Sequence, residues 1–456
     1  MLFIKKFKEI ASSGFVKSTV VLVGGSVFSQ AVAVLILPIL TRLYSPEDFG
    51  VLAVYVAIMG VLSAIVCLRF EVAIPMPSDD KEAFCLLVLS LGSTALLSLL
   101  ILMAVFFFQA DIINFSGQPR IADYLYFFPL GAFLVGVFSS FQYWAIRKKN
   151  FKAVAKTRLS QSISSAVTQV GLGFSSASPL GLILGYVVNI GSGSLGLCRA
   201  MCQTDGALFK TTSALNLKVI FQKYERFPKL SAPEALANSA AIQVPVIIIA
   251  SYALGSEAGF LLLGMRVMQA PLGVIGQAIS QVYLSRASEE YRRNNLDKFT
   301  LEVFAGLFRA GVGPLLFAGV VAPNVFGFVF GPQWIRSGEL VSWMALWYVF
   351  QFLSSPLSMA LQVTRSQGVA LGLQIFGFVL RVSSVIVAAK FFGKDFVSEA
   401  YAISGAVFYA IYLVVILKVL SISFFEAVKV VQKCFPIFVG WLCAAYLFVF
   451  LSSKVF

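Results

Sequence analysis

The 456-residue sequence contains no histidine and few charged residues, which make up 12% of the chain. Without histidine there is no histidine-ligated metal site, no Ser-His-Asp triad and no histidine proton relay. A soluble protein has about 25% charged residues. The hydrophobic content of 59% and the mean hydropathy of +0.88 complete the pattern. This composition predicts an all-α polytopic membrane protein.

Conventional catalytic and ligand-binding motifs are also missing. The six cysteines fall in apolar runs or in loops expected in the cytoplasm, and Cys198 and Cys202 lack the second pair that a zinc site needs. There is no GxxxxGK[ST] loop, no dinucleotide fingerprint and no pair of carboxylates within an apolar run. We therefore predict no catalytic residues, no cofactor, no metal, no disulfide framework and no ATP-driven pump.

Uncharged apolar runs of the length that spans a bilayer, about 20 residues, recur along the chain. The expected spans are residues 18–41, 49–68, 83–110, 124–146, two within 159–198 that the turn-like SSASP at 175–179 separates, 235–256, 258–285, 303–330, 340–364, 366–389, 400–417 and 434–453. The sequence FFEAVKVVQK before the last run predicts a short interfacial amphipathic helix. Twelve or thirteen spans result, depending on whether the last run crosses the membrane.

The basic residues indicate how the chain is oriented. A net charge of +14 would favour nucleic-acid binding in a soluble chain. In a membrane protein, Lys and Arg concentrate in cytoplasmic loops. With the N-terminus in the cytoplasm and the spans alternating, most of the 35 basic residues fall on the cytoplasmic side. We predict a cytoplasmic N-terminus and no nucleic-acid partner.

A hydrophilic segment, residues 199–229, divides the spans into six before it and six or seven after it. This predicts an N-terminal lobe (1–202), a cytoplasmic linker (203–230), a C-terminal lobe (231–420), and a last part (421–456) with the amphipathic segment and a probable extra helix. The short turns at 43–50 and 254–259 both contain Ser and Glu. Either this similarity is chance, or the lobes are parallel repeats about an axis along the membrane normal.

Three arginines lie within the expected spans: Arg266, Arg309 and Arg381. Each costs about 2.5–3.5 kcal/mol at a helix centre on insertion scales, so such residues usually face the bundle interior or a watery cavity. Few acids lie nearby in sequence to neutralise them. One interpretation is that these side chains cap helix ends or reach the interface. The other is that they bind an anion, because guanidinium suits bidentate contact with phosphate.

Polar side chains recur at helical spacing on several spans. Arg266, Gln269, Gly273, Gln277 and Ser280 share one face of the run 258–285. Such groups either hydrogen-bond neighbouring helices or line a polar cavity. Uncharged hydrogen-bonding groups in a cavity suit a sugar. The candidate sugar-binding residues are Gln30, Asn238, Gln269, Gln277, Gln351, Gln362 and Gln374.

Three segments carry a family resemblance: LPILTRLYSPEDFGVLAVY, LRFEVAIPMPSDDKEA and GFLLLGMRVMQAPLGVIGQAISQVYLSRASE. They resemble the Wzx-type polysaccharide (O-antigen repeat unit) flippases of the multidrug/oligosaccharidyl-lipid/polysaccharide exporter superfamily. The resemblance covers most of the chain, although a thirteenth helix departs from the family's usual twelve. It implies two six-helix lobes around a central cavity, related to the multidrug and lipid II flippases.

The resemblance also implies a function. These proteins move undecaprenyl-pyrophosphate-linked repeat units from the cytoplasmic to the outer leaflet of the bacterial inner membrane by alternating access, and they are not enzymes. A polysaccharide polymerase and a chain-length regulator are the implied protein partners. Cavity arginines are thought to hold the pyrophosphate. Arg266 is the best carry-over, and Arg42 and Arg69 lie inside family-like motifs, so they join Arg309 and Arg381 as candidates.

Two alternatives remain open at this point. A multidrug exporter of the same superfamily usually has acidic cation sites, and these are scarce in the expected spans. A membrane enzyme that acts on lipid-linked sugars would more usually have a larger outside loop than the short ones expected here. No residue identifies the coupling ion.

Overall fold

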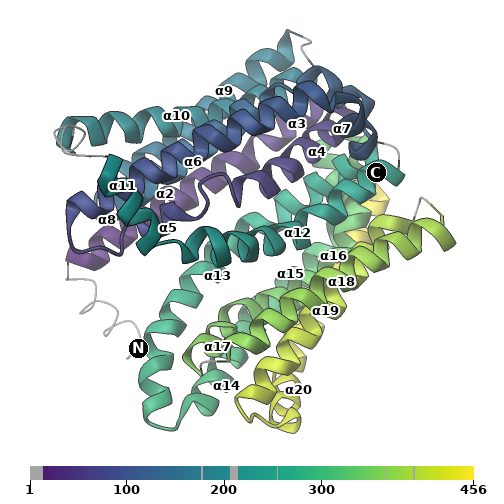
Figure 1. The fold of residues 1–456 in the computed structure, drawn as a ribbon. Coiled ribbons are helices and arrows are strands. Elements are labelled where there is room, and N and C mark those ends of the chain that lie inside the picture. Colours follow the sequence, from purple (N-terminus) through teal and green to yellow (C-terminus); the bar gives the residue numbers. More distant parts are fainter. Residues whose placement is uncertain are drawn as a thin grey trace. The chain divides into compact units, whose positions relative to one another are not determined.

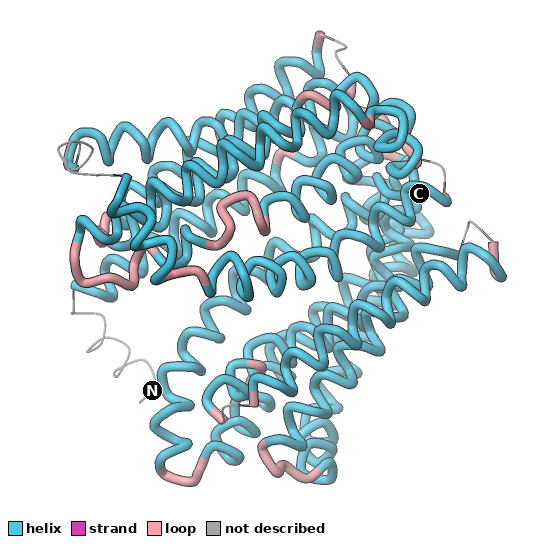
Figure 2. The backbone as a smooth tube through the Cα atoms, viewed as in Figure 1, coloured by secondary structure: helices cyan, strands magenta, loops and turns pink. Residues whose placement is uncertain are grey.

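The computed structural model describes residues 14–175, 178–205, 214–253, 255–364, 366–393 and 396–455. In these residues all regular secondary structure is helical (Figure 2), which confirms the all-α prediction. Eleven helices in this part of the chain are long and apolar enough to cross a membrane. Helix α9 (Phe151–Phe174) and helix α13 (Ser256–Arg292) also match predicted spans but are not among the eleven. Both helices are rich in polar residues.

The chain divides into two compact units. The first unit comprises residues 1–44 and 51–243, and the second comprises residues 45–50 and 244–456. Helix α4 (Pro46–Ser63) and helix α12 (Ala232–Tyr252) each have residues in both units.

The first unit is a bundle of long helices (Figure 1). Its remaining helices are α2 (Gly14–Leu35), α3 (Leu37–Leu43), α5 (Phe70–Ala73), α6 (Asp80–Phe107), α7 (Gln109–Ser116), η1 (Pro119–Tyr124), α8 (Phe127–Arg147), α9, α10 (Leu180–Asp205), α11 (Ala214–Lys223) and the π-helical η3 (Phe227–Ser231). Helix α9 packs along α10 and α2, and α8 packs against α6 and α10. Phe84, Trp144 and Val154 are central to one apolar cluster of this unit. Polar caps begin two of the helices, because the side chains of Asp79 and Asn150 accept backbone N–H groups of α6 and α9.

The second unit is built around α16, which packs against α13, α15 and α19. Its helices are α13, α14 (Leu296–Leu307), η4 (Phe308–Val312), α15 (Gly313–Phe330), η5 (Pro332–Trp334), α16 (Ile335–Leu357), α17 (Met359–Val363), α18 (Gln367–Phe391), α19 (Val397–Val419) and α20 (Phe424–Val455). The turn η4 is π-helical. It ends two residues before Pro314, whose ring would clash with a carbonyl of the preceding turn in a regular α-helix, so the proline accounts for the wider turn.

Helix α20 corrects one prediction. The sequence predicted an interfacial helix over FFEAVKVVQK and a separate span over 434–453. The structure has one continuous helix from Phe424 to Val455, with Pro436 inside it. A membrane helix tolerates such a proline when neighbours satisfy the released carbonyl. No glycine or turn sequence separates the two predicted segments, so nothing in the chain ends the helix between them.

Candidate functional site

Arg381, on α18, lies in a nest of aromatic rings inside the second unit. Its guanidinium carbon is 4.7 Å from the Phe408 ring centroid and 5.5 Å from those of Trp347 and Tyr409. The residue is 5% exposed. The rings come from α16 and α19, which pack on each other, and α18 packs on α19. The negative faces of aromatic rings attract a cation. These contacts therefore replace part of the water that a buried guanidinium loses.

The rings leave hydrogen-bonding capacity of Arg381 unused. Its Nε and Nη2 atoms are buried and have no hydrogen-bond partner, and no described acidic residue forms an ion pair with it. Nearby on α16, the Trp347 indole N–H, the Tyr348 hydroxyl and the Gln351 carbonyl oxygen are also buried without a partner. Buried donors without acceptors are costly. The N–H groups and the positive charge of Arg381 are therefore available to an anion that enters this part of the structure.

Arg266 is half-buried on α13, which packs against α16. An added Cβ at Gly264 would meet Met344 and Val341 of α16 at 3.1 Å. By contrast, an added Cβ at Gly273 or Gly276 would meet no atom within 4 Å. The face of α13 beyond Arg266 is therefore open at these glycines.

The remaining candidate arginines have different surroundings. Arg309 is exposed on the π-helical turn η4, and Arg42 is exposed in the last turn of α3. Arg69 lies just before α5, with its Nη1 atom 3.6 Å from a carboxylate oxygen of Glu71. Arg42 and Arg69 belong to the first unit, and Arg266, Arg309 and Arg381 to the second.

The candidate sugar-binding residues divide in the same way. Gln30 and Asn238 lie in the first unit and the others in the second. Most of them are exposed, whereas Gln351 is half-buried, one turn beyond Trp347. Gln269 is one of the exposed residues and lies near the Tyr348 hydroxyl. The exposed members are Gln30, Asn238, Gln269, Gln362 and Gln374. The side chain of Gln277 lies outside the described part of the structure.

Two features of these sites are not predicted by the sequence patterns. Arg158 lies within α9 and donates a hydrogen bond to the Ser26 hydroxyl of α2. It directly precedes the uncharged run that begins at residue 159, so run length places it outside the predicted span. Polar spacing within one helix does not predict the rings around Arg381. Trp347 and Phe408 are about 60 residues apart in sequence, and only packing of α16 on α19 brings them together.

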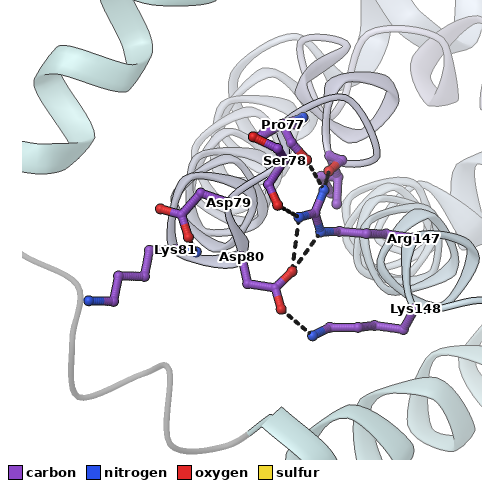
Figure 3. A network of polar contacts seen from close by, with 8 residues as sticks. Pro77, Ser78, Asp79, Asp80, Lys81, Arg147 and Lys148 are labelled. Atoms are coloured by element: carbon purple, nitrogen blue, oxygen red, sulfur yellow. Dashed lines mark hydrogen bonds and ion pairs between the residues drawn. The ribbon is translucent and has the colours of Figure 1, made fainter.

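Arg147, at the end of α8, forms hydrogen bonds with the start of α6 in the first unit (Figure 3). Arg147 donates to Asp80 from Nε (3.1 Å) and Nη2 (2.9 Å), to the Ser78 carbonyl (3.2 Å) and to the Pro77 carbonyl. Lys148 donates to the other Asp80 oxygen at 2.7 Å. The side chain of Arg147 is 9% exposed. Its planar fork contacts several acceptors at once, and an ammonium group does not reproduce that geometry.

We therefore expect Arg147→Lys to lower the free energy of unfolding by about 1–2 kcal/mol, because charge-assisted hydrogen bonds are lost at a mostly buried position. Thermal unfolding of the detergent-solubilised protein measures this change. Arg199→Lys is the matched control, since Arg199 is exposed on α10. Equal melting temperatures for the two variants would contradict the structural role of Arg147.

A second ionic network lies in the second unit. Arg336 of α16 contacts Glu257 of α13 (2.9 Å), Glu339 of its own helix (3.2 Å) and Glu399 of α19 (2.6 Å). Glu399 is 5% exposed. Because one guanidinium serves carboxylates from three helices, we interpret this network as a structural tie between helix ends. Arg336 was not among the predicted site residues.

Comparison with known proteins identifies the family. Residues 39–339 match the family described as "Polysaccharide biosynthesis protein". The chain belongs to this family. No curated protein matches the sequence.

The fold of this polysaccharide biosynthesis protein is found in solved transporters. It is similar to the lipid II flippase MurJ in an inward closed conformation, with 14% identity, coverage of 96% of this chain and 98% of that chain, and a TM-score of 0.69. It is also similar to an inward-facing multidrug resistance MATE family transporter of the MOP superfamily, with 16% identity, coverage of 87% and 94%, and a TM-score of 0.63. At these identities the likeness concerns the fold, which is the MurJ/MATE exporter fold that the sequence predicted.

Proposed function

We propose that this protein is a flippase for undecaprenyl-pyrophosphate-linked oligosaccharide repeat units. It would move them from the cytoplasmic to the outer leaflet of the bacterial inner membrane, by alternating access, for assembly of O-antigen, capsule or exopolysaccharide. A polysaccharide polymerase and a chain-length regulator would act on the product. The family match supports a role in polysaccharide synthesis, and the exporter fold supports transport of a substrate rather than chemistry on it.

The observation that carries the proposal is the buried guanidinium of Arg381. It lies in a helix apolar enough to span the membrane, no described carboxylate neutralises it, and two of its N–H groups lack acceptors. A pyrophosphate supplies both the missing negative charge and several acceptor oxygens. In this proposal Arg266 and Arg381 hold the pyrophosphate and Arg42, Arg69 and Arg309 assist along its path.

The uncharged amides would contact the sugar. Gln269, Gln351 and the other predicted residues offer both donors and acceptors, which match hydroxyl groups. The polyprenyl tail would remain in the bilayer, because its transfer into water is unfavourable in proportion to its apolar area.

The MATE-like fold favours a multidrug exporter as a second candidate. Cationic drugs need carboxylates that lack a partner. The buried carboxylates of Glu71 and Glu399 already form ion pairs, with Arg69 and Arg336 respectively. We therefore rank this candidate below the flippase.

A flip assay tests the proposal. The purified protein is reconstituted into vesicles that contain a polyprenyl-pyrophosphate-linked oligosaccharide, and a membrane-impermeant glycosidase reports the substrate that becomes accessible. We expect exposure of intact substrate well above that in empty vesicles. Exposure equal to empty vesicles, with an ion gradient imposed in either direction, would contradict the proposed function. Uptake of cationic dyes instead would favour the multidrug exporter, and a change in the bonds of the glycan would favour an enzyme.

A further inference from the structure

The ion pair of Arg69 and Glu71 in the first unit differs from the other ion pairs near it. Glu71 is 6% exposed, and among the described residues it forms an ion pair with Arg69, at 3.6 Å, which is too long for a hydrogen bond. Glu71 Oε2 and Arg69 Nε are both buried without a hydrogen-bond partner. The carboxylate of Glu71 is therefore enclosed, and both partners of the pair have a buried polar atom without a hydrogen bond.

The neighbouring acids of this unit are better compensated. Asp80 is bound by Arg147 and Lys148, and Glu82 accepts hydrogen bonds from Lys223 and Tyr224. Both acids are more exposed than Glu71. An ion pair at 3.6 Å without a hydrogen bond gives up less electrostatic energy when it is broken than an ion pair at hydrogen-bond distance. Of Glu71, Asp80 and Glu82, Glu71 is therefore the acid whose basic partner a competing anion can bind most easily.

The backbone around the pair is held in an uncommon conformation. Leu68 and Arg69 are successive non-glycine residues with positive φ, 50° and 63°. Left-handed backbone is unfavourable for a branched side chain such as leucine. Strain of this kind persists only where the surrounding structure imposes it, and it is common at functional sites. Here it places the Arg69 side chain, which is about one-third exposed, over the buried carboxylate of Glu71.

We propose that pyrophosphate binding at Arg69 displaces Glu71, and that Glu71 then takes up a proton. This inference rests on the proposed function and adds a proton to its binding step. The carboxylate accepts one proton from solvent and becomes a neutral carboxylic acid, so no uncompensated charge stays buried. When the pyrophosphate leaves Arg69, the proton is released and the ion pair forms again.

The charges that face Glu71 are consistent with this exchange. Helix α5 packs against α6, α8 and η3. Cys67 and Tyr143 interact electrostatically with Glu71, but both are neutral near pH 7. Of the charged groups on these elements, Asp80, Glu82, Arg147 and Lys229 have ion-pair partners of their own, and Lys81 is exposed at the start of α6. Among the described residues, Arg69 is the cation in an ion pair with Glu71.

Titration of Glu71 has a defined direction. Burial raises the pKa of Glu71, and a backbone hydrogen bond and the Arg69 guanidinium lower it by less. Loss of Arg69 to an anion removes one of the two lowering influences, so the pKa rises further in the complex. Binding and protonation are therefore linked, and affinity falls as pH rises between the pKa of the free site and that of the complex.

Calorimetry in buffers of different ionisation enthalpy tests the inference on the full-length protein. The probe is farnesyl-pyrophosphoryl-N-acetylglucosamine, whose two phosphates are esterified and do not titrate near neutral pH. We expect the wild-type protein to take up a fraction of a proton per probe, largest midway between the pKa of the free site and that of the complex. We expect no uptake by Glu71→Gln and unchanged uptake by Glu225→Gln, a control because Glu225 is an exposed acid paired with Lys229.

The affinities should follow the same pattern. Wild-type affinity is expected to fall by up to about tenfold per pH unit over the linked range, while Glu71→Gln stays within about twofold. Binding with equal proton uptake by wild type and Glu71→Gln would overturn the role of Glu71 and leave the proposed flippase intact. Absence of probe binding by the wild type would overturn both.

A second measurement needs no variant. Dicyclohexylcarbodiimide reacts with protonated carboxyl groups in apolar surroundings, and mass spectrometry locates the product. Labelling of Glu71 in the wild-type protein is expected to rise when the probe is added at constant pH. Unchanged or reduced labelling would overturn the inference even if Glu71→Gln does not fold.

Discussion

Replacing Arg266 with alanine is expected to lower the flipping rate at subsaturating substrate by about 100-fold. A truncated charge-assisted contact in a partly desolvated site costs about 3 kcal/mol, and each 1.4 kcal/mol is a factor of ten. Arg266 is half-buried on the helix whose face is open at Gly273 and Gly276. The reconstituted glycosidase assay measures the flipping rate, and thermal unfolding of the variant checks that its fold is intact.

Two further variants sharpen this prediction. Arg266→Lys keeps the charge but not the planar fork, so it should recover only part of the rate, about tenfold above alanine. Arg292→Ala is the control, because Arg292 is exposed in the last turn of the same helix. Normal flipping by Arg266→Ala at matched protein level would remove Arg266 from the proposed site.

Gly338→Ala is expected to lower the free energy of unfolding by about 3 kcal/mol, at the upper end of the range for overpacking. An added Cβ would lie 2.6 Å from both the Ala322 carbonyl oxygen and the Pro323 Cα of α15. Both are backbone atoms, so no side chain can turn aside. Helices α15 and α16 would have to separate, and α16 holds Trp347 against Arg381.

A second glycine provides the comparison. Gly372 lies on α18, where an added Cβ would meet no atom within 4 Å. Alanine is about 1 kcal/mol better than glycine in a helix interior, so Gly372→Ala should be neutral or slightly stabilising. Thermal unfolding in detergent, followed by the soluble folded fraction, compares the two variants. Similar melting temperatures would refute the close contact of α15 and α16.

Hydrophobic run length predicted the helices well. A helix covers most of every predicted run, because a bilayer requires long apolar segments and their backbones must form internal hydrogen bonds. The failures lie at the boundaries of these runs. Arg158 sits inside α9 because nothing in the sequence ends the helix between Phe151 and residue 159. In the same way, α20 begins at Phe424, about ten residues before the apolar run 434–453 from which its span was predicted.

The environment of each candidate was less predictable than its position. Arg381 was found by its charge, but its rings come from two other helices. The burial of Glu71 depends on how the short helix α5 packs against α6 and α8. Such properties arise from tertiary contacts between residues that are distant in sequence, so periodicity does not encode them.

Helix α20 has a practical consequence for spectroscopy. Only 11% of its most apolar 18-residue window is buried, and Cys443 on this helix is exposed, whereas Cys67, Cys85 and Cys434 are buried. With Cys198 and Cys202 changed to serine, Cys443 would be the remaining thiol that is not buried. A fluorophore or spin label there would report on the second unit from its periphery, without disturbing the rings around Arg381 or the Arg336 network.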